Sequence, residues 1–345
     1  MKSLTVAVPV YNTEKYLKRC FDSLLIDDVL EDLEIVAVND GSRDGSLSIL
    51  NDYAGMYPDT VRVIDKENGG HGSAVNAALE CASGKYFRIL DSDDWVASDD
   101  FVQFMQRIRT EDADAVITNY SKEFVYDGHT EKITWERLED NKKYVFDEID
   151  LEILNKEYFV MANTVYRTEL LKRAGLRLME KTFYVDMQYN TVPIPYVNNF
   201  RYYDLDIYRY FIGRPDQSMN LESFIRNRSD HERVMRFLVD SYTEHENELS
   251  PNKKEYIKYI LYYSLTTHYN IHCVYPKKGS GERYAAIKAF DAYLKEKNTE
   301  LYDLMNKVGK IRYNRKTKFI FAKLGPQFFS KLIERGGRIL KRKGN

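Results

Sequence analysis

The chain has 345 residues, of which 43% are hydrophobic and 30% are charged, and its mean hydropathy is −0.53. This length allows one large domain or two modest ones with a substantial core. No apolar run approaches the roughly 18–20 residues that a transmembrane helix needs, so we expect a soluble chain without such a helix. The formal net charge of −2 combines a body near −14 with a basic segment, residues 307–345, near +12.

The first part of the chain is expected to alternate strands with helices. The third of these helices covers residues 74–79 and follows a glycine-rich turn at 69–72. Such alternation implies βαβ units, a mainly parallel sheet and a ligand crevice at the C-terminal ends of the strands. Apolar runs predict the strands at 4–9, 34–38, 61–64 and 86–91, with a helix after each of the first three.

The middle of the chain mixes both kinds of element, and the chain beyond residue 220 has a helical pattern. We expect helices at 101–108, 148–156 and 168–174, strands at 115–118, 160–166 and 202–212, antiparallel strands within 120–147, and a strand or loop turning into a helix at 182–188. Further helices are expected at 221–247, 251–273 and 282–297. We therefore divide the chain into an α/β domain (1–218), a helical region (219–305) and a basic amphipathic tail (306–345).

The fourth predicted strand ends in three carboxylates within four positions, Asp91, Asp93 and Asp94. These groups repel one another and cannot all be buried in the ionised form without a cation. Oxygen ligands favour a hard divalent metal such as Mg²⁺ or Mn²⁺, particularly one that also holds a phosphate. The alternative is a solvated turn that caps the next helix near Ser98.

Four motifs follow one another in a fixed order. The first is VAVPVYN, at the end of segment 4–12, and the second is VAVNDGSRDGS at 36–46. The third is NGGHGSAVN at 68–76, and the fourth is the acidic strand end. In this order and spacing they resemble the family 2 glycosyltransferases over roughly residues 1–215. The resemblance implies a GT-A fold, in which helices flank a Rossmann-like, mainly parallel sheet, here followed by a C-terminal α-helical region. It also implies an inverting enzyme of the bacterial surface-polysaccharide type.

The resemblance assigns the nucleotide site to the ends of the first two strands. Pro9, Val10 and Tyr11 would contact the nucleotide, and the Asp40 carboxylate would accept a hydrogen bond from a pyrimidine N–H. The alternative for Asp40 is a turn residue before Gly41, a position that suits aspartate equally well.

The glycine-rich motif is assigned to the diphosphate or ribose. Asn68 and Gly70 would approach the ligand closely because this stretch has few side chains, and a flexible connection is the alternative. The family often has a basic residue in or beside this motif, whereas residues 74–76 contain none. The motif is not a clean G-x-G-x-x-G, so we reject a dinucleotide fingerprint. His71 is interpreted as a loop residue rather than a ligand.

The same resemblance assigns the acidic strand end to binding of the donor and of the metal. Asp91 and Ser92 would contact the donor, and Asp93 with Asp91 would bind Mg²⁺ or Mn²⁺, with Asp94 as the next candidate. The metal would stabilise the charge that develops on the departing nucleoside diphosphate.

Asp186 stands where the family carries its catalytic base, near the start of a helix under the acceptor site. The usual motif is a Glu-Asp pair, whereas Val185 precedes Asp186 here. A helix N-cap is the alternative, and Glu180 is the fallback base. Arg214 is expected to fold over the diphosphate, with a surface turn as its alternative. The acceptor floor is assigned to Asn163, Tyr166 and Arg167.

The basic tail interleaves apolar residues with 13 Lys and Arg and a single acid. This pattern predicts an interfacial helix on an anionic membrane surface. A helix docked on the acidic body and a nucleic-acid arm are the alternatives. The apolar residues are Phe319, Ile320, Phe321, Leu324, Phe328, Phe329, Leu332, Ile333, Ile339 and Leu340.

The cysteines and the N-terminal residues indicate the cellular compartment in which we expect the protein. Cys20, Cys81 and Cys273 form no C-x-x-C pattern and suit a reducing environment. A strand begins almost directly after Met1, without a recognisable signal peptide. We expect a cytoplasmic protein, peripheral on the inner face of the cell membrane if the tail binds lipid.

The sequence thus predicts a metal-dependent inverting glycosyltransferase. It would move a sugar from a nucleotide-diphospho-sugar, with a UDP-sugar favoured, to a hydroxyl on a glycan or lipid-linked glycan. No nucleic-acid partner is expected, and homo-oligomerisation is left open. One alternative is a sugar-phosphate nucleotidyltransferase, which usually carries a glycine-rich basic loop where this chain has residues 9–13. The other is a non-catalytic nucleotide-sugar-binding scaffold.

Overall fold

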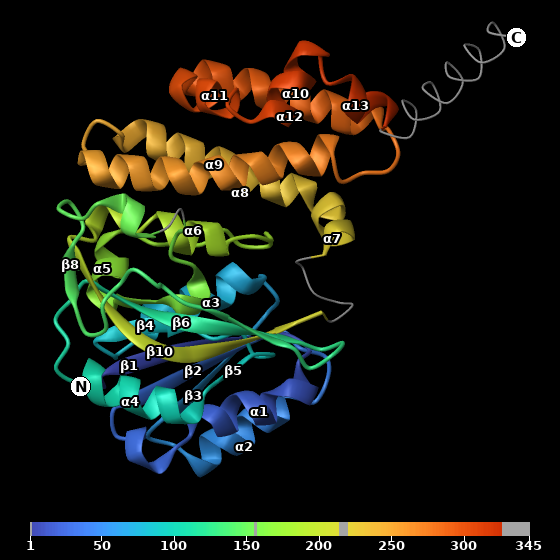
Figure 1. The fold of residues 1–345 in the computed structure, drawn as a ribbon. Helices are drawn as coiled ribbons and strands as arrows, with labels where there is room; N and C mark the ends of the chain where they lie inside the picture. The colour runs from blue at the N-terminus through green and yellow to red at the C-terminus, as the bar shows by residue number, and fades with distance from the viewer. Residues whose placement is uncertain (1, 155–156, 214–219, 326–345) are drawn as a thin grey trace, which may run out of the picture. The chain divides into compact units, whose positions relative to one another are not determined.

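The structure is a computed structural model that describes residues 2–154, 157–213 and 220–325. The chain forms two compact units. Unit 1 comprises residues 1–217 together with 249–256, and unit 2 comprises residues 218–248 together with 257–345. Figure 1 shows the order of the elements in each unit.

Unit 1 is built on one ten-stranded sheet whose strand order is β3-β2-β1-β4-β9-β6-β10-β5, with β7 on β6 and β8 on β10. Strands β1 to β4, β6 and β10 point the same way, and β5, β7, β8 and β9 run against them. The predicted α/β, mainly parallel, GT-A type sheet is therefore confirmed. The strands are β1 (Leu4–Val10), β2 (Leu33–Asp40), β3 (Val61–Lys66), β4 (Tyr86–Ile89), β5 (Trp95–Val96), β6 (Ala115–Phe124), β7 (Thr130–Ile133), β8 (Lys143–Val145), β9 (Thr164–Arg167) and β10 (Asn199–Ile212).

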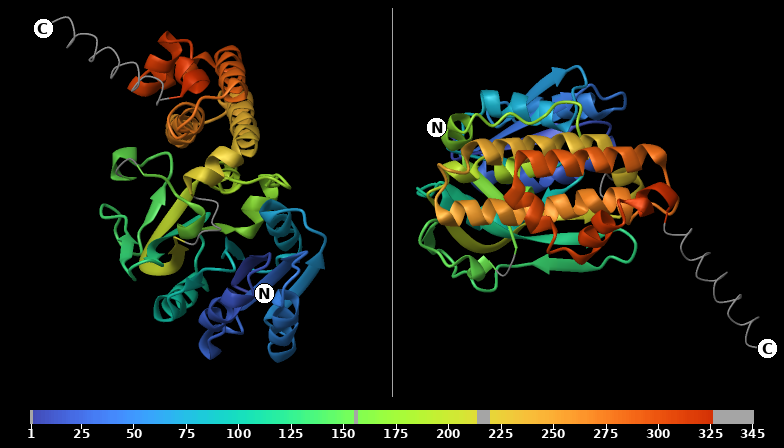
Figure 2. Two further views of the ribbon diagram at one scale, coloured as in Figure 1. Left: turned by 90° about the vertical axis from the view of Figure 1, so that its right-hand side faces the viewer. Right: turned by 90° about the horizontal axis from the view of Figure 1, so that it is seen from above.

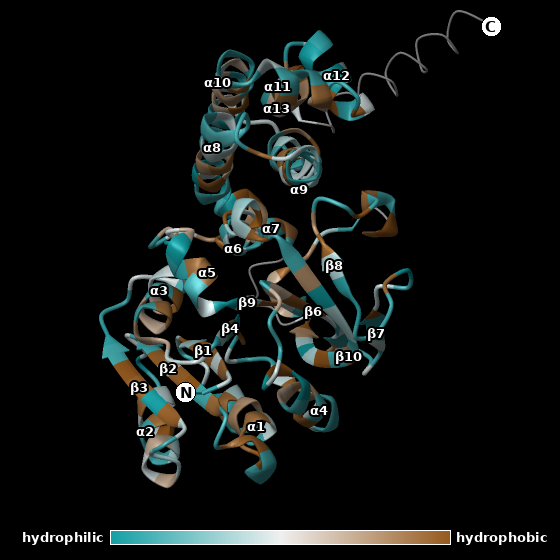
Figure 3. Cartoon of the chain, turned by 90° about the vertical axis from the view of Figure 1, so that its left-hand side faces the viewer, coloured by the Kyte–Doolittle hydropathy of each residue, from teal (hydrophilic) through white to brown (hydrophobic). Residues whose placement is uncertain are grey.

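Helices cover both faces of this sheet. α1, α2 and α4 lie on one face, and α3, α5 and α6 lie on the other (Figure 1). β1 and β2 are buried along their whole length, as expected for strands that are covered on both sides, and β2 is coloured hydrophobic in Figure 3. The helices are α1 (Glu14–Leu24), α2 (Ser46–Met56), α3 (His71–Cys81), α4 (Ser98–Ile108), α5 (Thr168–Arg173) and α6 (Asp186–Thr191).

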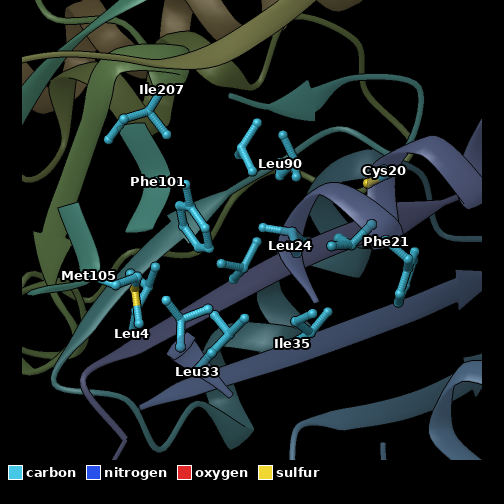
Figure 4. Packing of buried hydrophobic residues seen from close by; sticks show 14 of the residues in the cluster. Leu4, Cys20, Phe21, Leu24, Leu33, Ile35, Leu90, Phe101, Met105 and Ile207 are labelled. Carbon is cyan, nitrogen blue, oxygen red and sulfur yellow. The ribbon is translucent and has the colours of Figure 1, made fainter. Parts of the chain in front are cut away.

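The main core of unit 1 lies between the sheet and the face covered by α1 and α4. Phe21 and Leu24 of α1 and Phe101 of α4 belong to one cluster with Leu4 and Ile35 of the sheet, and all five are fully buried (Figure 4). Each such side chain contributes about 1.5–3 kcal/mol through its burial. The apolar face of α1 recurs at helical spacing, which is why the sequence pattern located it correctly.

The structure corrects several predicted elements. The helix expected at 148–156 is a short 3₁₀ turn at Leu151–Leu154, and residues 155–156 lie outside the described range. The strand expected at 160–166 begins with a 3₁₀ turn at Met161–Asn163 before β9. The two remaining 3₁₀ turns are Asp27–Val29 and Ile194–Tyr196.

The predicted helix at 221–247 is divided in two at Asn227. This residue ends α7 (Leu221–Arg226) with φ −95° and ψ 25°, outside the helical region, and α8 (Arg228–His245) starts after it. Asparagine favours such caps because its side chain competes with the helical backbone. The helices predicted at 251–273 and 282–297 are confirmed as α9 (Pro251–Cys273) and α10 (Gly281–Lys297).

Unit 2 is helical throughout its described part. α8 and α9 lie side by side, and α10 packs against α8 (Figures 1 and 2). Within the described residues of the chain, no helix is long and apolar enough to cross a membrane. The remaining helices are α11 (Thr299–Met305), α12 (Gly309–Lys316) and α13 (Ile320–Leu324).

The described start of the basic tail is part of this packing. Ile311 and Phe319 are only 2% and 4% exposed, and Arg315 donates from Nε to Asp291 at 2.7 Å. Residues 309–324 therefore form two short helices docked in unit 2, rather than the start of one long interfacial helix. Of the apolar tail residues, those from Phe328 to Leu340 lie outside the described residues.

Candidate active site

The candidate site lies at the point of the sheet where the strand order reverses, because β2 and β3 lie on one side of β1 and β4 lies on the other. β1 has β2 on one side and β4 on the other, so the C-terminal ends of these three strands meet at one edge. Ligands of open α/β sheets bind at such a switch point. Tyr11 follows β1, Asp40 is the last residue of β2 and Asp91 follows β4, so these sequence motifs meet at one edge of the sheet.

The end of β1 presents one accessible side chain. Pro9 and Val10 are buried, whereas Tyr11 is 48% exposed. Asn12 follows with φ +54° and accepts from the Arg43 backbone N–H at 2.7 Å, which ties this loop to the one after β2. Of the three residues assigned to the nucleotide at this strand end, Tyr11 alone has an exposed side chain.

Asp40 holds the glycine-rich loop. Its Oδ1 accepts from the Gly69 N–H and from Lys66 Nζ, both at 2.9 Å, and its Oδ2 accepts from the Gly70 N–H at 2.7 Å. The side chain is 2% exposed. A carboxylate has about four acceptor positions, so the predicted contact with a pyrimidine N–H would have to use the remaining one. That contact stays a prediction, and the structural role of Asp40 is a finding that the sequence pattern did not indicate.

The glycines of segment 68–72 allow two parts of the backbone to pack closely. A Cβ on Gly72 would lie 2.3 Å from the Met179 carbonyl oxygen, and one on Gly70, where φ is +84°, would lie 3.1 Å from the Lys181 nitrogen. Lys181 also donates its backbone N–H to Gly69 at 2.6 Å. The expected flexible turn is therefore an ordered contact with segment 178–182, and α3 already begins at His71.

Replacing Gly72 with alanine is expected to destabilise unit 1 by about 1–3 kcal/mol, because the new methyl group overlaps a backbone carbonyl that cannot rotate away. Urea unfolding followed by circular dichroism measures this change. Gly55→Ala in α2 is the matched control: its Cβ would meet nothing within 4 Å, so this change should stabilise the helix by up to about 1 kcal/mol. Equal effects of the two changes would contradict the close contact.

The three carboxylates after β4 have different surroundings. Oxygens of Asp91, Asp93 and Asp94 lie within 4.8 Å of one another. Asp94 is fully buried; its Oδ2 accepts from Tyr208 Oη at 2.5 Å and its Oδ1 accepts from the Phe211 N–H at 2.8 Å. Asp91 and Asp93 are half-buried. The surroundings therefore favour Asp91 and Asp93 as metal ligands, while Asp94 fixes the turn against β10.

Burial and the charge of Asp91 raise the pKa of Asp94 well above the ordinary range. Tyr208 offsets part of this cost, since its hydroxyl donates to Asp94 and also accepts the Asp91 N–H at 3.3 Å. Ser92 is 3% exposed and its Oγ lies 2.9 Å from Thr13 Oγ1, so its side chain joins the turn to the loop after β1. These contacts hold the acidic turn in one conformation.

Tyr208→Phe is expected to lower the free energy of unfolding by about 1–3 kcal/mol, because Asp94 would lose a buried hydrogen-bond donor. Chemical denaturation measures this loss. Tyr120 lies opposite Tyr208 in the β6–β10 ladder, and Tyr120→Phe serves as the control with a smaller expected effect. If both changes had the same cost, the proposed role of the Tyr208 hydroxyl would be wrong.

Arg19 is a site residue that the sequence analysis missed. It lies on α1, donates from Nη2 to the Asp93 carbonyl at 3.0 Å, and stacks with its Cζ 3.7 Å from the Trp95 ring centroid. Its guanidinium also lies 4.3 Å from the Phe211 ring centroid. No motif connects residues 74 positions apart in sequence, so only the fold reveals that Arg19 supports the acidic turn.

His71 is the second residue that was misjudged. It is the first residue of α3 rather than a loop residue, and its Nε2 lies 2.9 Å from Asp91 Oδ1. Burial lowers the pKa of His71, but Asp91, Asp186 and Asp40 outweigh this effect and raise the pKa above its ordinary value. The surroundings of His71, beside Asp91, therefore favour its protonated form. The sequence feature that could have identified His71 as a site residue is its position directly after Gly69 and Gly70.

Asp186 is the first residue of α6. The side chain of the preceding residue, Val185, makes no capping hydrogen bond, and Asp186 does not occupy the N-cap position that was considered as its alternative. Burial raises the pKa of Asp186, His71 lowers it, and Asp91 raises it again. The electrostatic effects of His71 and Asp91 on Asp186 indicate that the fold brings the start of α6 near the acidic turn.

The residues assigned to the acceptor floor, the fallback base and the diphosphate differ in their exposure and contacts. Asn163 and Tyr166 are each 1% exposed, and Asn163 Oδ1 accepts from the Val160 N–H at 2.9 Å, so both support the fold beneath the surface. Glu180 is exposed and pairs with Arg177 at 3.4 Å. Arg214 lies outside the described residues.

Glu180 also borders a cavity of about 530 Å³ in unit 1. Its lining includes Lys66, Asn76 and Lys172, together with other residues of α3 and the loop after α5, but none of the three site carboxylates Asp91, Asp93 and Asp186. This cavity is therefore distinct from the acidic turn, which weakens the case for Glu180 as a substitute base.

Comparisons with known proteins agree with this geometry. Residues 5–175 match the model of the family described as Glycosyl transferase family 2. Among curated proteins, the chain is 40% identical over 118 residues to glycosyltransferase GlyG of Streptococcus pneumoniae, covering 34% of this chain and 38% of GlyG. It is 33% identical over 179 residues to the uncharacterized glycosyltransferase EpsJ of Bacillus subtilis, covering 50% of each. The matched parts thus span half or less of these relatives.

The fold also has a match among solved structures. Residues 1–349 of TarS from S. aureus, crystallised in complex with UDP-GlcNAc, superpose with a TM-score of 0.66 at 19% identity. The superposition covers 93% of this chain and 89% of that chain. At this identity the similarity establishes the fold alone.

Proposed function

The chain belongs to glycosyltransferase family 2, and from this we propose that it is an inverting glycosyltransferase that uses a nucleotide-diphospho-sugar, with a UDP-sugar favoured, and an acceptor hydroxyl on a glycan or lipid-linked glycan. The observation that carries the proposal is the convergence of Asp91, Asp93 and Asp186 on the switch-point edge of the sheet. Asp91 and Asp93 come from the acidic turn after β4, whereas Asp186 comes from a separate motif at the start of α6.

The donor would lie over the ends of β1 and β4. Tyr11, which is 48% exposed, would stack on the nucleotide base, and Asn68 would reach the ligand from the glycine-rich loop, where its side chain donates to the Asp40 carbonyl at 2.9 Å. A TarS fragment with the same fold binds UDP-GlcNAc, which supports UDP as the first nucleotide to test. Four further assigned residues would shape this site through their backbone, since their side chains are buried, hydrogen-bonded or absent. They are Pro9, Val10, Gly70 and Ser92.

The residues present suit a divalent metal. Asp91 and Asp93 offer half-buried carboxylate oxygens on one tight turn, and oxygen ligands are those that Mg²⁺ and Mn²⁺ prefer. A metal held there would supply positive charge to the departing diphosphate. The chain itself contributes Arg19, which fixes the Asp93 backbone, and His71, which balances the charge of Asp91. Arg214 is proposed as a further cation for the diphosphate.

Asp186 is proposed as the general base. The acceptor oxygen forms a bond to the anomeric carbon while the bond from that carbon to the diphosphate oxygen breaks, and the acceptor proton passes to the Asp186 carboxylate. Burial raises the pKa of Asp186 and therefore strengthens it as a base. His71 opposes that shift and so favours the ionised carboxylate. The single displacement inverts the configuration of the sugar.

Assembly of a cell-surface polysaccharide on the cytoplasmic side is the proposed setting. Among the relatives, a chondroitin synthase of Pasteurella multocida is 44% identical to this chain over 96 residues, which is 28% of this chain and 10% of that protein. The basic charge of residues 307–345 is consistent with a position beside an anionic membrane.

Isothermal titration calorimetry of the full chain with UDP, GDP, CDP and dTDP, each with and without Mn²⁺, tests the proposal. We expect one nucleotide, UDP, to bind in a metal-dependent way, followed by turnover with its sugar conjugates. A folded protein that binds none of the four nucleotides would refute the donor site, and nucleotide binding without turnover would favour the scaffold. Release of pyrophosphate from a nucleoside triphosphate and a sugar phosphate would instead identify a nucleotidyltransferase.

A further inference from the structure

Unit 2 contains a buried cluster of histidines that the proposed reaction does not use. His268 and His272 lie four residues apart on α9 and therefore face the same side of the helix. Glu232 of α8 faces them. One potential ligand atom from each of these three residues lies within 4.8 Å of the other two. We call these residues the Glu232–His268–His272 cluster.

The histidine nitrogens of this cluster are buried without partners. His268 is fully buried and His272 is 1% exposed. Within the described part of the chain, neither His268 Nε2 nor either ring nitrogen of His272 has a hydrogen-bond partner of good geometry, and, although burial lowers the pKa of His272, the Arg283 backbone lies near enough to raise it in part. Burying such a polar atom unpaired costs about 1–3 kcal/mol, so three in one place require an explanation. Burial favours the neutral imidazole, in which one ring nitrogen keeps a lone pair for a ligand.

Neighbouring side chains orient the cluster. His231 Nδ1 lies 3.3 Å from His268 Nδ1, and when His268 donates its proton there, its Nε2 keeps the lone pair. Arg236 donates from both Nε and Nη2 to Glu232 Oε1, at 2.9 Å and 2.8 Å. Contacts of this kind, made by an outer group to a ligand side chain, are typical of metal sites.

We propose that Glu232, His268 and His272 form a binding site for a transition-metal cation of the Zn²⁺ class. Two imidazoles and a carboxylate are a common ligand set for Zn²⁺, whereas the all-oxygen acidic turn in unit 1 suits Mg²⁺ or Mn²⁺. Because the ligands come from α8 and α9, the cation would join these two helices, and its binding free energy would add to the stability of unit 2.

An anion is the competing occupant. Arg283 acts electrostatically on His272, and its Nε is also buried without a partner among the described residues. A guanidinium attracts anions such as phosphate and does not ligate metals. The two occupants predict opposite results when Zn²⁺ and inorganic phosphate are added separately.

The test uses the full chain carrying Asp93→Ala, so that the acidic turn contributes less to metal binding. Purified protein is stripped with a chelator and titrated with Zn²⁺ against a chromophoric competitor, and bound metal is counted by mass spectrometry. We expect one Zn²⁺ per chain, a higher melting temperature with Zn²⁺, and a Co²⁺ visible spectrum of low coordination number. No uptake of Zn²⁺, or stabilisation by phosphate in place of Zn²⁺, would overturn the proposal.

Two further substitutions locate the site. Glu232→Gln keeps the side-chain shape and should weaken Zn²⁺ binding at least about tenfold. His245→Ala removes an exposed histidine of the same helix, whose Nδ1 lies 2.9 Å from the Ser241 carbonyl oxygen, and should leave Zn²⁺ binding unchanged. Circular dichroism checks that both variants fold. Equal Zn²⁺ affinities in the two variants would place the metal elsewhere, and the uptake by the parent chain tests the proposal even if one variant is unstable.

Discussion

Asp93→Ala is expected to lower the rate of sugar transfer by about 10²- to 10³-fold and to remove the metal dependence of UDP binding. The diphosphate leaving group carries negative charge that the protein must balance, and losing one electrostatic contact of this kind has an effect of that size. Asp93 and Asp91 are the half-buried members of the acidic turn, while Asp94 is committed to Tyr208 and the Phe211 backbone.

The measurement is calorimetry of UDP binding with and without Mn²⁺, combined with a turnover assay. Asp99→Ala is the matched control, because Asp99 is an exposed aspartate in the first turn of α4, six residues further along the chain. That variant should bind and turn over like the wild type. If Asp93→Ala retained metal-dependent UDP binding, Asp93 would not be a metal ligand.

Asp186→Asn is expected to reduce kcat by about 10²- to 10⁴-fold and to leave the Kd for UDP unchanged. Asparagine preserves the size of the side chain and its place at the start of α6 but cannot take the acceptor proton. Single-turnover kinetics and calorimetry separate the two effects. Glu180→Gln is the control, since Glu180 is an exposed carboxylate that pairs with Arg177. Loss of UDP binding in Asp186→Asn, or loss of turnover in Glu180→Gln, would contradict the assignment.

The pH dependence of kcat provides an independent test of Asp186. Burial raises the pKa of this carboxyl group, and the base must be ionised to act. The rate should therefore fall as the pH is lowered through that raised pKa, at a higher pH than an ordinary aspartate would give. His71→Gln removes the cation that lowers the pKa of Asp186, so the acid limb should move to still higher pH. An unchanged profile would argue against the influence of His71 on the base.

Several assignments that rested on the sequence agree with the fold because they depend on local patterns. β1, β2 and β4, which carry or precede Tyr11, Asp40 and Asp91, are mostly apolar, and all three are buried along their whole length. The rule that ligands bind at the C-terminal ends of parallel strands then brought the three segments to one edge. The helix expected at 148–156 was wrong because a short polar stretch has too little periodicity to decide between a helix and a turn.

The amino-acid sequence by itself determined the alternation of strands and helices, the family of unit 1 and the carboxylates available to its site. Only the tertiary structure decided what each group does. It paired the buried Asp94 with Tyr208, placed His71 beside Asp91, and set Arg19 against the Asp93 backbone. Hydrophobic periodicity reports which face of one element is buried, whereas pKa values and ligand sets depend on side chains that are distant in sequence and meet only after folding.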